Sequence, residues 1–333
     1  MQLGTGLFTC QRRPGDGRSG ADRYREMLDL AAAIDDAGLD SAWVSEHHFA
    51  SDDYLSGVLP ALGALAAETE DVELGPCIAL APLHDPVRLA EDAATVDLLS
   101  DGRLTMGLAI GSNPREFEQF GVPTEERTDR LEDAVAVLRA AWSAGPLDYD
   151  AEFHPVDPDV TVTPTPDGDV PVVLGGAAKP AVRRAARLGD GWVAPSKLSV
   201  DGVRKRVDDV RAVRDAEGVD GDFRTYVLRH GFVADAEDEA WDAMRDGYFY
   251  LQRRYAEIFS GEPVDELDAD RKRELRDQAV YGTPGEVREE LAAYEDAVGD
   301  DCHVILRTYY PGMDTDAMVE CVQRLGDEVV PGL

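Results

Sequence analysis

Short apolar runs alternate along this chain with longer segments whose apolar residues recur at helical spacing. Runs rich in β-branched and aromatic side chains predict strands, whereas apolar residues three or four positions apart predict helices that bury one face. The runs with the strand pattern are Gln2–Thr9, Ser41–Ser45, Val72–Leu80, Leu104–Ile110, Val170–Leu174, Gly191–Ala194, Tyr226–Val233 and His303–Thr308.

Start and stop signals for helices lie between these runs. A first helix is expected to end at Gly38, because glycine adopts the left-handed conformation that terminates helices. Asp85 and Pro86 suit the cap and the first turn of another helix. Two more helices are predicted, one that starts at Thr124 and one over Pro284–Val298. The alternation of strands and helices indicates an α/β fold.

Eight strand–helix repeats of this length predict a (β/α)8 barrel, also called a TIM barrel. A doubly wound sheet is the alternative, but it needs a Gly-x-Gly-x-x-Gly turn that is absent after Thr9. We expect a single domain over residues 1–333 with two insertions. Segment 145–169 is rich in Pro and Asp and predicts an irregular excursion with short strands. Segment 246–278 predicts a helical insertion that covers the barrel mouth.

The net charge of −34 comes from 67 acidic and 33 basic residues. Nucleic acid and anionic membrane surfaces would be repelled by this charge, so neither is expected as a partner. The acids are spread over many predicted helices, which argues against a disordered acidic tail. A halophilic, haloarchaeal type of protein is the better interpretation, because high salt screens self-repulsion.

The four cysteines lie far apart and form no Cys-x-x-Cys pair, which favours a reduced cytoplasm over a disulfide framework or a zinc site. No apolar stretch reaches the length of about 18 residues that a membrane span needs. The chain enters a strand at Gln2 without the basic and apolar regions of a signal peptide. We therefore expect a soluble cytoplasmic protein.

A carboxylate and two imidazoles follow the second strand-like run. Glu46, His47 and His48 come directly after it, on the face where barrel enzymes carry catalytic groups. Histidine changes charge near neutral pH, so it can act as acid, base or hydrogen-bond donor. These three residues are therefore candidate catalytic residues, although a strand cap and a core hydrogen bond would use the same residue types. No metal is expected, because neither His-x-x-x-His nor a cysteine partner accompanies them.

A glycine turn joins the fifth strand-like run to a helix start. Exposed amides at Gly175, Gly176, Ala177 and Ala178 would form an anion nest at the helix N-terminus. Lys179 stands where it could neutralise a phosphate. An ordinary turn that needs glycine for its geometry would have the same sequence, so both interpretations stay open.

Further polar residues fall at or just after the ends of other predicted strands. Gly111 and Asn113 close the fourth run, where glycines would let a flat ligand approach the backbone. Possible substrate contacts at other strand ends are Lys197, Arg307, Tyr309 and Tyr310. Tight strand–helix packing and solvated loops are the alternatives for these residues.

Taken together, the segments resemble the bacterial luciferase-like superfamily of flavin- and deazaflavin-dependent oxidoreductases. The resemblance covers most of the chain and is strongest over 43–122 and 172–194. The motifs that carry it are Glu46-His-His-Phe49, Pro82-Leu-His-Asp-Pro-Val-Arg-Leu-Ala-Glu-Asp92, Leu98-Leu-Ser-Asp-Gly-Arg103, Gly175-Gly, Ala185-Ala-Arg-Leu-Gly-Asp-Gly-Trp192 and Gly282-Thr-Pro-Gly-Glu-Val-Arg288.

The resemblance implies a (β/α)8 barrel that binds FMN or the deazaflavin F420 at its C-terminal mouth, with an insertion lid and commonly a homodimer. It implies that His47 is catalytic. It also implies a cis peptide or a bulge at Cys77–Ile78, against one face of the cofactor ring. Gly111, Asn113 and the loop from Gly175 to Lys179 would complete the cofactor site.

The sequence departs from luciferases in two places. Ile110 replaces the arginine that holds the FMN phosphate, and the phosphate loop lacks hydroxyl side chains. The Gly175-Gly turn, Gly189-Asp-Gly-Trp192 and Lys197 resemble the F420-dependent branch, whereas Glu46-His-His48 resembles the FMN monooxygenase branch. F420 is the favoured cofactor and FMN the alternative.

The favoured function is hydride transfer between F420 and a small organic substrate, in which the protein positions the ring and tunes its electronics. The second hypothesis is a monooxygenase that uses reduced FMN and O2, must exclude water from its site, and would need a flavin reductase as partner. The third is a flavin-binding protein without catalysis, which the intact Glu46-His-His48 disfavours.

Overall fold

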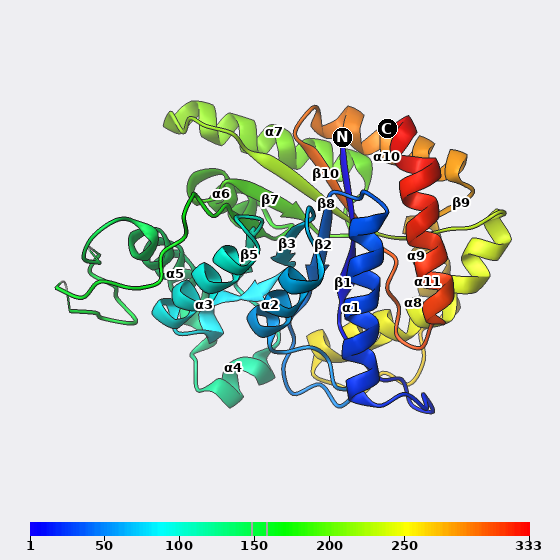
Figure 1. The fold of residues 1–333 in the computed structure, drawn as a ribbon, viewed down its shortest axis with the longest axis horizontal. Helices are drawn as coiled ribbons and strands as arrows, with labels where there is room; N and C mark the ends of the chain where they lie inside the picture. The colour runs from blue at the N-terminus through cyan, green and yellow to red at the C-terminus, as the bar shows by residue number, and fades with distance from the viewer. Residues whose placement is uncertain (148, 158) are drawn as a thin grey trace.

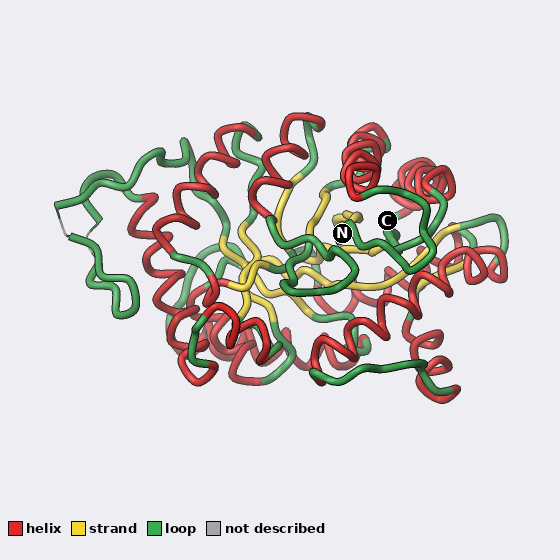
Figure 2. The backbone as a smooth tube through the Cα atoms, turned by 90° about the horizontal axis from the view of Figure 1, so that it is seen from below, coloured by secondary structure: helices red, strands yellow, loops and turns green. Residues whose placement is uncertain are grey.

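Parallel strands form the centre of the molecule in a computed structural model that describes residues 1–147, 149–157 and 159–333 (Figure 1). Viewed from below, the strands lie inside a ring of helices (Figure 2). The strands are β1 (Gln2–Phe8), β2 (Ser41–Val44), β3 (Glu73–Pro76), β4 (Ala79–Leu80), β5 (Met106–Ala109), β6 (Val172–Gly175), β7 (Gly191–Ala194), β8 (Arg224–Val233), β9 (Val280–Gly282) and β10 (Cys302–Arg307).

The strands follow one another in the order β3-β2-β1-β10-β8-β7-β6-β5-β4, and all pairs are parallel. A parallel bridge between Leu74 and Leu104 brings the two ends of this order together. The predicted (β/α)8 barrel is therefore confirmed as a nearly closed parallel ring. The short strand β9 pairs with the end of β8, outside the ring.

One strand of the ring is divided, where the sequence predicted a continuous run over Val72–Leu80. β3 pairs with β2, and β4 pairs with β5, so the chain changes neighbours between them. The peptide bond Cys77–Ile78 at this break is cis, as the resemblance implied. Together β3 and β4 occupy one position of the ring.

The helices pack around the strands, and their limits agree with most of the predicted signals. Asp85 caps α3 by accepting from the N–H groups of Val87 and Arg88, and Gly38 has a φ of +68° just after α1. The helices are α1 (Gly20–Asp36), α2 (Val58–Glu68), α3 (Pro86–Leu99), α4 (Pro114–Phe120), α5 (Arg127–Trp142), α6 (Lys179–Leu188), α7 (Val200–Glu217), α8 (Glu237–Ser260), α9 (Ala269–Gln278), α10 (Pro284–Val298) and α11 (Thr315–Arg324).

One predicted helix start needs correction, and one short helix was missed. Thr124 opens only a 3₁₀ turn over Thr124–Glu126, and α5 begins at Arg127. The short helix α4 was not predicted. Its start signals, Asn113 as cap and Pro114 in the first turn, are clear once the end of β5 is known.

Apolar side chains fill the interior of the ring, so no open channel runs through it. One side chain from nearly every strand position contributes: Leu7, Trp43, Cys77, Val173, Val193, Tyr226 and Ile305. A larger cluster lies between the strands and the surrounding helices. Because the interior is packed, the space for a ligand lies beyond the carboxyl ends of the strands, as in other barrels.

The two predicted insertions differ in structure. The described residues of segment 145–169 belong to no helix or strand, contrary to the short strands that were expected, and the segment extends away from the body (Figure 1). Prolines in this segment lack the N–H that a strand ladder requires. In segment 246–278, α8 and α9 form the predicted helical part, residues 261–268 between them belong to no helix, and α8 already begins at Glu237.

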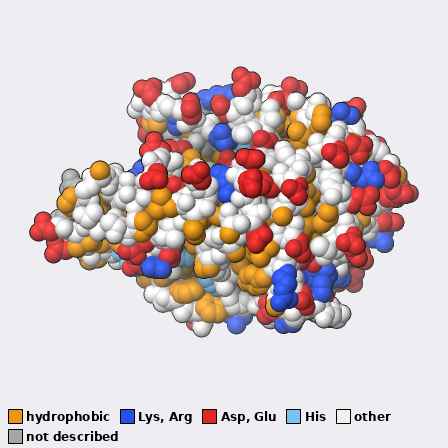
Figure 3. Space-filling view, in the orientation of Figure 1, with side chains coloured by type: hydrophobic (Ala, Val, Ile, Leu, Met, Phe, Trp, Pro, Cys, Tyr) orange, Lys and Arg blue, Asp and Glu red, His pale blue; other side chains and the backbone are white. Residues whose placement is uncertain are grey.

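Acidic side chains are spread over much of the face drawn in Figure 3. Hydrophobic side chains gather near its lower edge over α4 and the adjoining loops, with histidine beside them. Phe49 and Phe120 belong to the exposed large apolar residues of this region. No helix among the described residues is both long and apolar enough to cross a membrane.

Candidate active site

Glu46 holds the loop after β2 against β4. Its Oε1 accepts hydrogen bonds from His48 Nε2 at 2.7 Å and His84 Nε2 at 2.8 Å, and its Oε2 accepts from the N–H of Leu80 at 2.6 Å. Burial opposes ionisation of Glu46, but these hydrogen bonds outweigh it and lower its pKa to about 2. Glu46 and His48 thus fasten two strand ends together, and their catalytic role stays a prediction.

His47 points away from this cluster and pairs with a second carboxylate. Its Nδ1 lies 3.0 Å from Oε1 of Glu116, which also accepts the backbone N–H of His48 at 2.8 Å. Glu116 is fully buried, and its Oε2 has no partner within the described residues. The hydrogen bond between Nδ1 and Oε1 leaves Nε2 of His47 open to a further donor or acceptor.

Glu116 is the main residue that the sequence analysis missed. It occupies the third position of α4, three residues after the cap Asn113, whose Oδ1 accepts the N–H of Arg115 at 3.1 Å. An acidic residue in the first turn of a helix that follows a barrel strand was the available signal, because helix N-termini favour negative charge. The structure thus uses Asn113 as a helix cap, and its predicted contact with a cofactor stays a prediction.

Aromatic rings surround the His47 imidazole. The ring centroids of Tyr54, Tyr255 and Phe259 lie 5.0, 5.9 and 6.0 Å from that of His47. Tyr255 and Phe259 come from α8, so the predicted insertion does contribute to the mouth. Tyr54 lies in the loop after β2, outside that insertion.

A chain of hydrogen bonds runs from Arg307 across the mouth. Arg307 Nη1 donates to the hydroxyl of Tyr255 at 3.0 Å, that hydroxyl lies 3.0 Å from the hydroxyl of Tyr54, and Tyr54 donates to Ser45 Oγ at 2.9 Å. Arg307 is completely buried, and burial opposes its charge although neighbouring tyrosines raise its pKa. A buried arginine held by neutral oxygens positions α8 at the end of β10.

Two residues that were predicted to contact the substrate are buried in the core. Tyr309 and Tyr310 are almost fully buried, and the ring of Tyr309 packs edge-on against Phe8 with centroids 5.4 Å apart. Burial raises the pKa of Tyr309 well above its usual value. In this conformation both tyrosines pack in the core, so a contact with the substrate would require a conformational change at the mouth.

The predicted phosphate loop packs directly against the divided strand. A Cβ atom on Gly175 would lie 2.1 Å from Ile78 Cδ1, so a larger residue there would displace the Ile78 side chain, and Gly176 has a φ of +141°. The helix α6 that follows has no side-chain cap at Ala178. Uncapped amides at a helix start can bind an anion. The loop Gly175–Ala178 and the bond Cys77–Ile78 are thus neighbours, and their contact with a cofactor stays a prediction.

Lys179 and Lys197 do not belong to the group of residues around His47. Lys179 Nζ lies 3.2 Å from Asp209 Oδ1, so its charge is already paired. Lys197 lines a separate cavity with Arg229 and Tyr294. Gly111 has a φ of +70° and packs against Phe117, which explains the glycine without a ligand.

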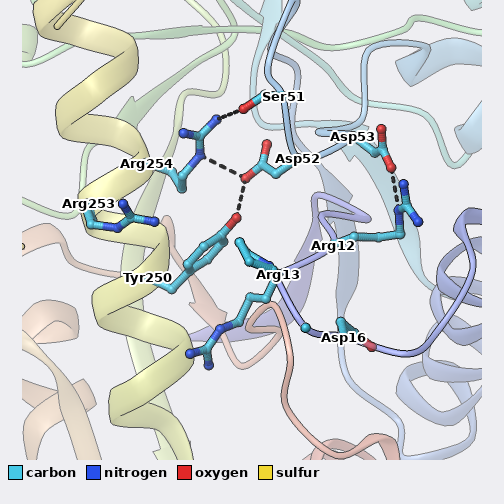
Figure 4. Close-up of a pocket in the computed structure, with 11 residues that line it drawn as sticks. Arg12, Arg13, Asp16, Ser51, Asp52, Asp53, Tyr250, Arg253 and Arg254 are labelled. Carbon is cyan, nitrogen blue, oxygen red and sulfur yellow. Dashed lines mark hydrogen bonds and ion pairs between the residues drawn. The ribbon is translucent and has the colours of Figure 1, made fainter. Parts of the chain in front are cut away.

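A second carboxylate cluster attaches α8 to the loops after β1 and β2 (Figure 4). Asp52 Oδ2 accepts from Gln11 Nε2 at 2.7 Å, from the Tyr250 hydroxyl at 2.9 Å and from Arg254 Nε at 3.0 Å. These bonds fix the helix that carries Tyr255 and Phe259. The geometry of the mouth therefore depends on contacts at its rim.

The described residues contain no cluster of three His, Cys, Asp or Glu side chains arranged to hold a metal ion. The four cysteines are buried and unpaired, and burial raises the pKa of each thiol to about 12. The arrangement at the mouth brings together a histidine, hydroxyl groups, aromatic rings and a helix start without a side-chain cap.

Comparisons with known proteins identify the family of the chain. The profile of a family described as luciferase-like monooxygenase matches residues 1–301. The oxygenase component of a flavin-dependent trigonelline monooxygenase from Acinetobacter baylyi is 26% identical over 98% of this chain and 94% of its own. An F420-dependent glucose-6-phosphate dehydrogenase from Beutenbergia cavernae is 32% identical, but over 52% of this chain and 53% of its own.

A solved structure shows the same fold over the full length. The crystal structure of the monooxygenase RslO1 from Streptomyces bottropensis superposes with a TM-score of 0.88, at 24% identity and 99% coverage of both chains. The chain therefore belongs to the luciferase-like monooxygenase family of flavin- and F420-dependent oxidoreductases.

Proposed function

We propose that this protein is the oxygenase component of a flavin-dependent monooxygenase that acts on a small organic substrate. The observation that carries the proposal is the enclosure of His47 by Tyr54, Tyr255 and Phe259. Oxygen-activating chemistry needs a site from which water is excluded. The full-length similarity to an oxygenase component supports the same function.

The residues of the mouth fit a phosphate-bearing cofactor. Gly175 lies against the Ile78 side chain, and α6 starts without a side-chain cap, so the amides after Gly176 would hold the phosphate. The ring would lie against Cys77–Ile78. A bound reduced flavin supplies the electrons that activate dioxygen.

His47 would move a proton at the reacting end of the substrate. Glu116 would orient the ring through its contact with Nδ1, so that Nε2 could take up a proton and release it. The second nearby group, the Tyr255 hydroxyl, would orient a substrate oxygen. The protein would work with a flavin reductase and would form a homodimer.

Hydride transfer with F420 is the second candidate. The loop Gly175–Lys179 without hydroxyl side chains and the half-length similarity to an F420-dependent dehydrogenase favour it. Both cofactors carry a phosphate, so the loop alone does not separate them. A reductase partner is required only by the flavin mechanism.

Identification of the small molecule that co-purifies from the native host separates the candidates. The proposal expects a species with the mass of FMN and absorbance near about 450 nm, whereas F420 absorbs near about 420 nm, both positions being properties of the cofactor that the protein only tunes. Recovery of F420 alone would overturn the flavin proposal.

A loop variant tests where the phosphate binds. Gly176→Asp places a carboxylate at the amides, so we expect affinity for FMN and F420 to fall strongly. Gly176→Ala is the matched control, because it adds strain at the positive φ without charge. Circular dichroism checks the fold, and unchanged affinity in the folded Asp variant would move the phosphate elsewhere.

A further inference from the structure

Three phenylalanines are exposed at the barrel mouth, whereas the others in the chain are buried or partly buried. Phe49, Phe120 and Phe259 expose 49, 44 and 53% of their surface. They come from segments that are distant along the chain: the loop after β2, the end of α4 and the last turn of α8. Single exposed apolar residues are common, but a group of them at one place indicates a binding surface.

These three rings lie beside the two histidines of the loop after β2. The ring centroid of Phe259 lies 6.0 Å from that of His47, and the ring centroid of Phe120 lies 4.8 Å from that of His48. The centroids of Phe49 and Phe120 are 5.3 Å apart. Because His47 and His48 are consecutive, the three phenylalanines flank one short stretch of backbone, on the face where Figure 3 shows hydrophobic side chains beside histidine.

Phe49 has a backbone conformation that its side chain disfavours. Its φ is +56°, in the left-handed region that bulky residues rarely adopt. Glycine or asparagine would adopt this conformation more easily. Burial does not compensate for the strain, because about half of the Phe49 surface is exposed. Strained residues of this kind are concentrated at functional sites, which favours a function for this side chain.

Phe259 is held in place from behind. Its ring is stacked on that of Tyr255, with centroids 5.8 Å apart and an angle of 19° between the planes. The Tyr255 hydroxyl accepts a hydrogen bond from Arg307 and lies 3.0 Å from the hydroxyl of Tyr54. More than half of the Phe259 surface is nevertheless open. A ligand that packs on this ring therefore has to immobilise little of the protein.

The open area suits a small ligand better than a second protein chain. A phenylalanine presents roughly 200 Å² of surface, so three half-exposed side chains offer roughly 300 Å². A stable protein interface needs about 800 Å² on each partner. Aromatic rings also attract other aromatic rings through stacked and edge-on contacts, in addition to the effect of buried area. A planar ring is therefore the ligand that this surface favours.

We propose that Phe259, with Phe120 and Phe49 beside it, binds the aromatic ring of the substrate next to His47. The substrate of the monooxygenase is then a planar aromatic compound, a statement that rests on the proposed function. The binding of the ring does not rest on it, because binding requires neither a cofactor nor turnover.

Isothermal titration calorimetry of the full chain without cofactor tests the surface with two uncharged probes. 2-Naphthol is aromatic, and decahydro-2-naphthol has the same carbon skeleton and hydroxyl group without planar rings. We expect 2-naphthol to bind about two- to tenfold more tightly, which is the value of an aromatic pair. Phe259→Leu keeps an apolar side chain, so it should weaken 2-naphthol binding by a similar factor and leave decahydro-2-naphthol binding unchanged.

Phe223→Leu is the matched control, because Phe223 precedes β8 and lies at the end of the barrel opposite the mouth. It should leave both affinities unchanged, and a thermal melt checks the fold of both variants. The proposal is wrong if native protein does not bind 2-naphthol, if it binds both probes equally, or if Phe259→Leu binds 2-naphthol as tightly as native protein.

Three further outcomes assign the surface. If Phe259→Leu loses affinity for FMN but not for 2-naphthol, the ring belongs to the cofactor site and the assignment to substrate is wrong. If light scattering shows that Phe259→Leu converts a dimer into monomers, a second copy of the chain covers the surface, and the assignment is wrong again. If 2-naphthol binds as expected to a chain without affinity for FMN or F420, the surface is supported and only the proposed function fails.

Discussion

Two buried glutamates each hold a histidine of the same loop, but they do so in different ways. Glu46 uses both oxygens and accepts from His48, His84 and a backbone N–H. Glu116 uses one oxygen for His47 and the N–H of His48, and its other oxygen has no partner within the described chain. Both oxygens of Glu46 therefore have hydrogen-bond partners, whereas only one oxygen of Glu116 has one among the described residues.

The difference separates a structural role from a functional one. Buried polar groups in proteins are nearly always hydrogen-bonded, so an incomplete one calls for an explanation. The satisfied Glu46 fastens β2 to β4 and is expected to contribute stability. The incomplete Glu116 stands behind a histidine that faces the mouth, so it is expected to contribute to turnover.

The largest expected effect is that of His47→Ala on turnover. Loss of an acid–base group typically costs about 10²–10⁴-fold in rate, while the fold should be retained because His47 is not part of the Glu46 cluster. Steady-state kinetics and a thermal melt measure both. His154→Ala, at a histidine on the 145–169 segment, is the control, and a folded His47→Ala enzyme with normal turnover would contradict a catalytic role.

The next effect is that of Glu46→Gln on stability. Breaking a buried charge pair typically costs about 3–5 kcal/mol, and His48, His84 and Leu80 would all lose an ionised partner. Urea unfolding measures the loss. If stability stays normal and turnover disappears, Glu46 is catalytic and the distinction between the two glutamates fails.

A smaller effect is expected from Glu116→Gln. The amide keeps the shape but removes the charge behind His47, which should reduce kcat by about ten- to a hundredfold, the value of a hydrogen bond to a charged group. Glu118→Gln changes an exposed glutamate of the same helix and should have no effect. If Glu116→Gln and Glu46→Gln lose the same free energy of unfolding, the proposed difference in role between the two glutamates is wrong.

The smallest effect is the pH dependence of the Glu46 contribution. The pKa of Glu46 is lowered to about 2, so the unfolded state binds more protons and the contribution, complete above about 4.5, is lost as pH falls toward 2. The pKa of His84 is raised by Glu46 despite its burial, so its part is lost as pH rises above about 6.5. The difference in the free energy of unfolding between the native protein and Glu46→Gln should therefore become smaller at low pH and at high pH.

The fold followed from periodicity more readily than from individual residues. Strands such as Gly191–Ala194 and the helix Pro284–Val298 were predicted with their observed limits, because the burial pattern and the caps are local. The division of Val72–Leu80 depends on neighbouring strands and cannot be read from the run itself. The halophilic interpretation and the single domain stay predictions.

The site was predicted in part for the same reason. His47 and the loop at Gly175 follow strands, so their place was visible in the sequence. The partners Glu116, His84 and Tyr54 come from elements distant along the chain, and pairing across a barrel mouth leaves no local pattern. Lys179 was expected to face a phosphate, whereas a contact with Asp209 takes its charge.

A single helix, α8, carries both Tyr250 at the rim and Tyr255 in the mouth. The helix is continuous over 250–255, so the two tyrosines move together. A change at the rim that favours the docked helix, such as formation of the hydrogen bond from Tyr250 to Asp52, therefore also favours the hydrogen bond from Arg307 to Tyr255. Linkage then requires the reverse as well: a molecule that engages Tyr255 in the mouth and prefers the docked helix must strengthen, by the same free energy, the attachment of α8 at Asp52.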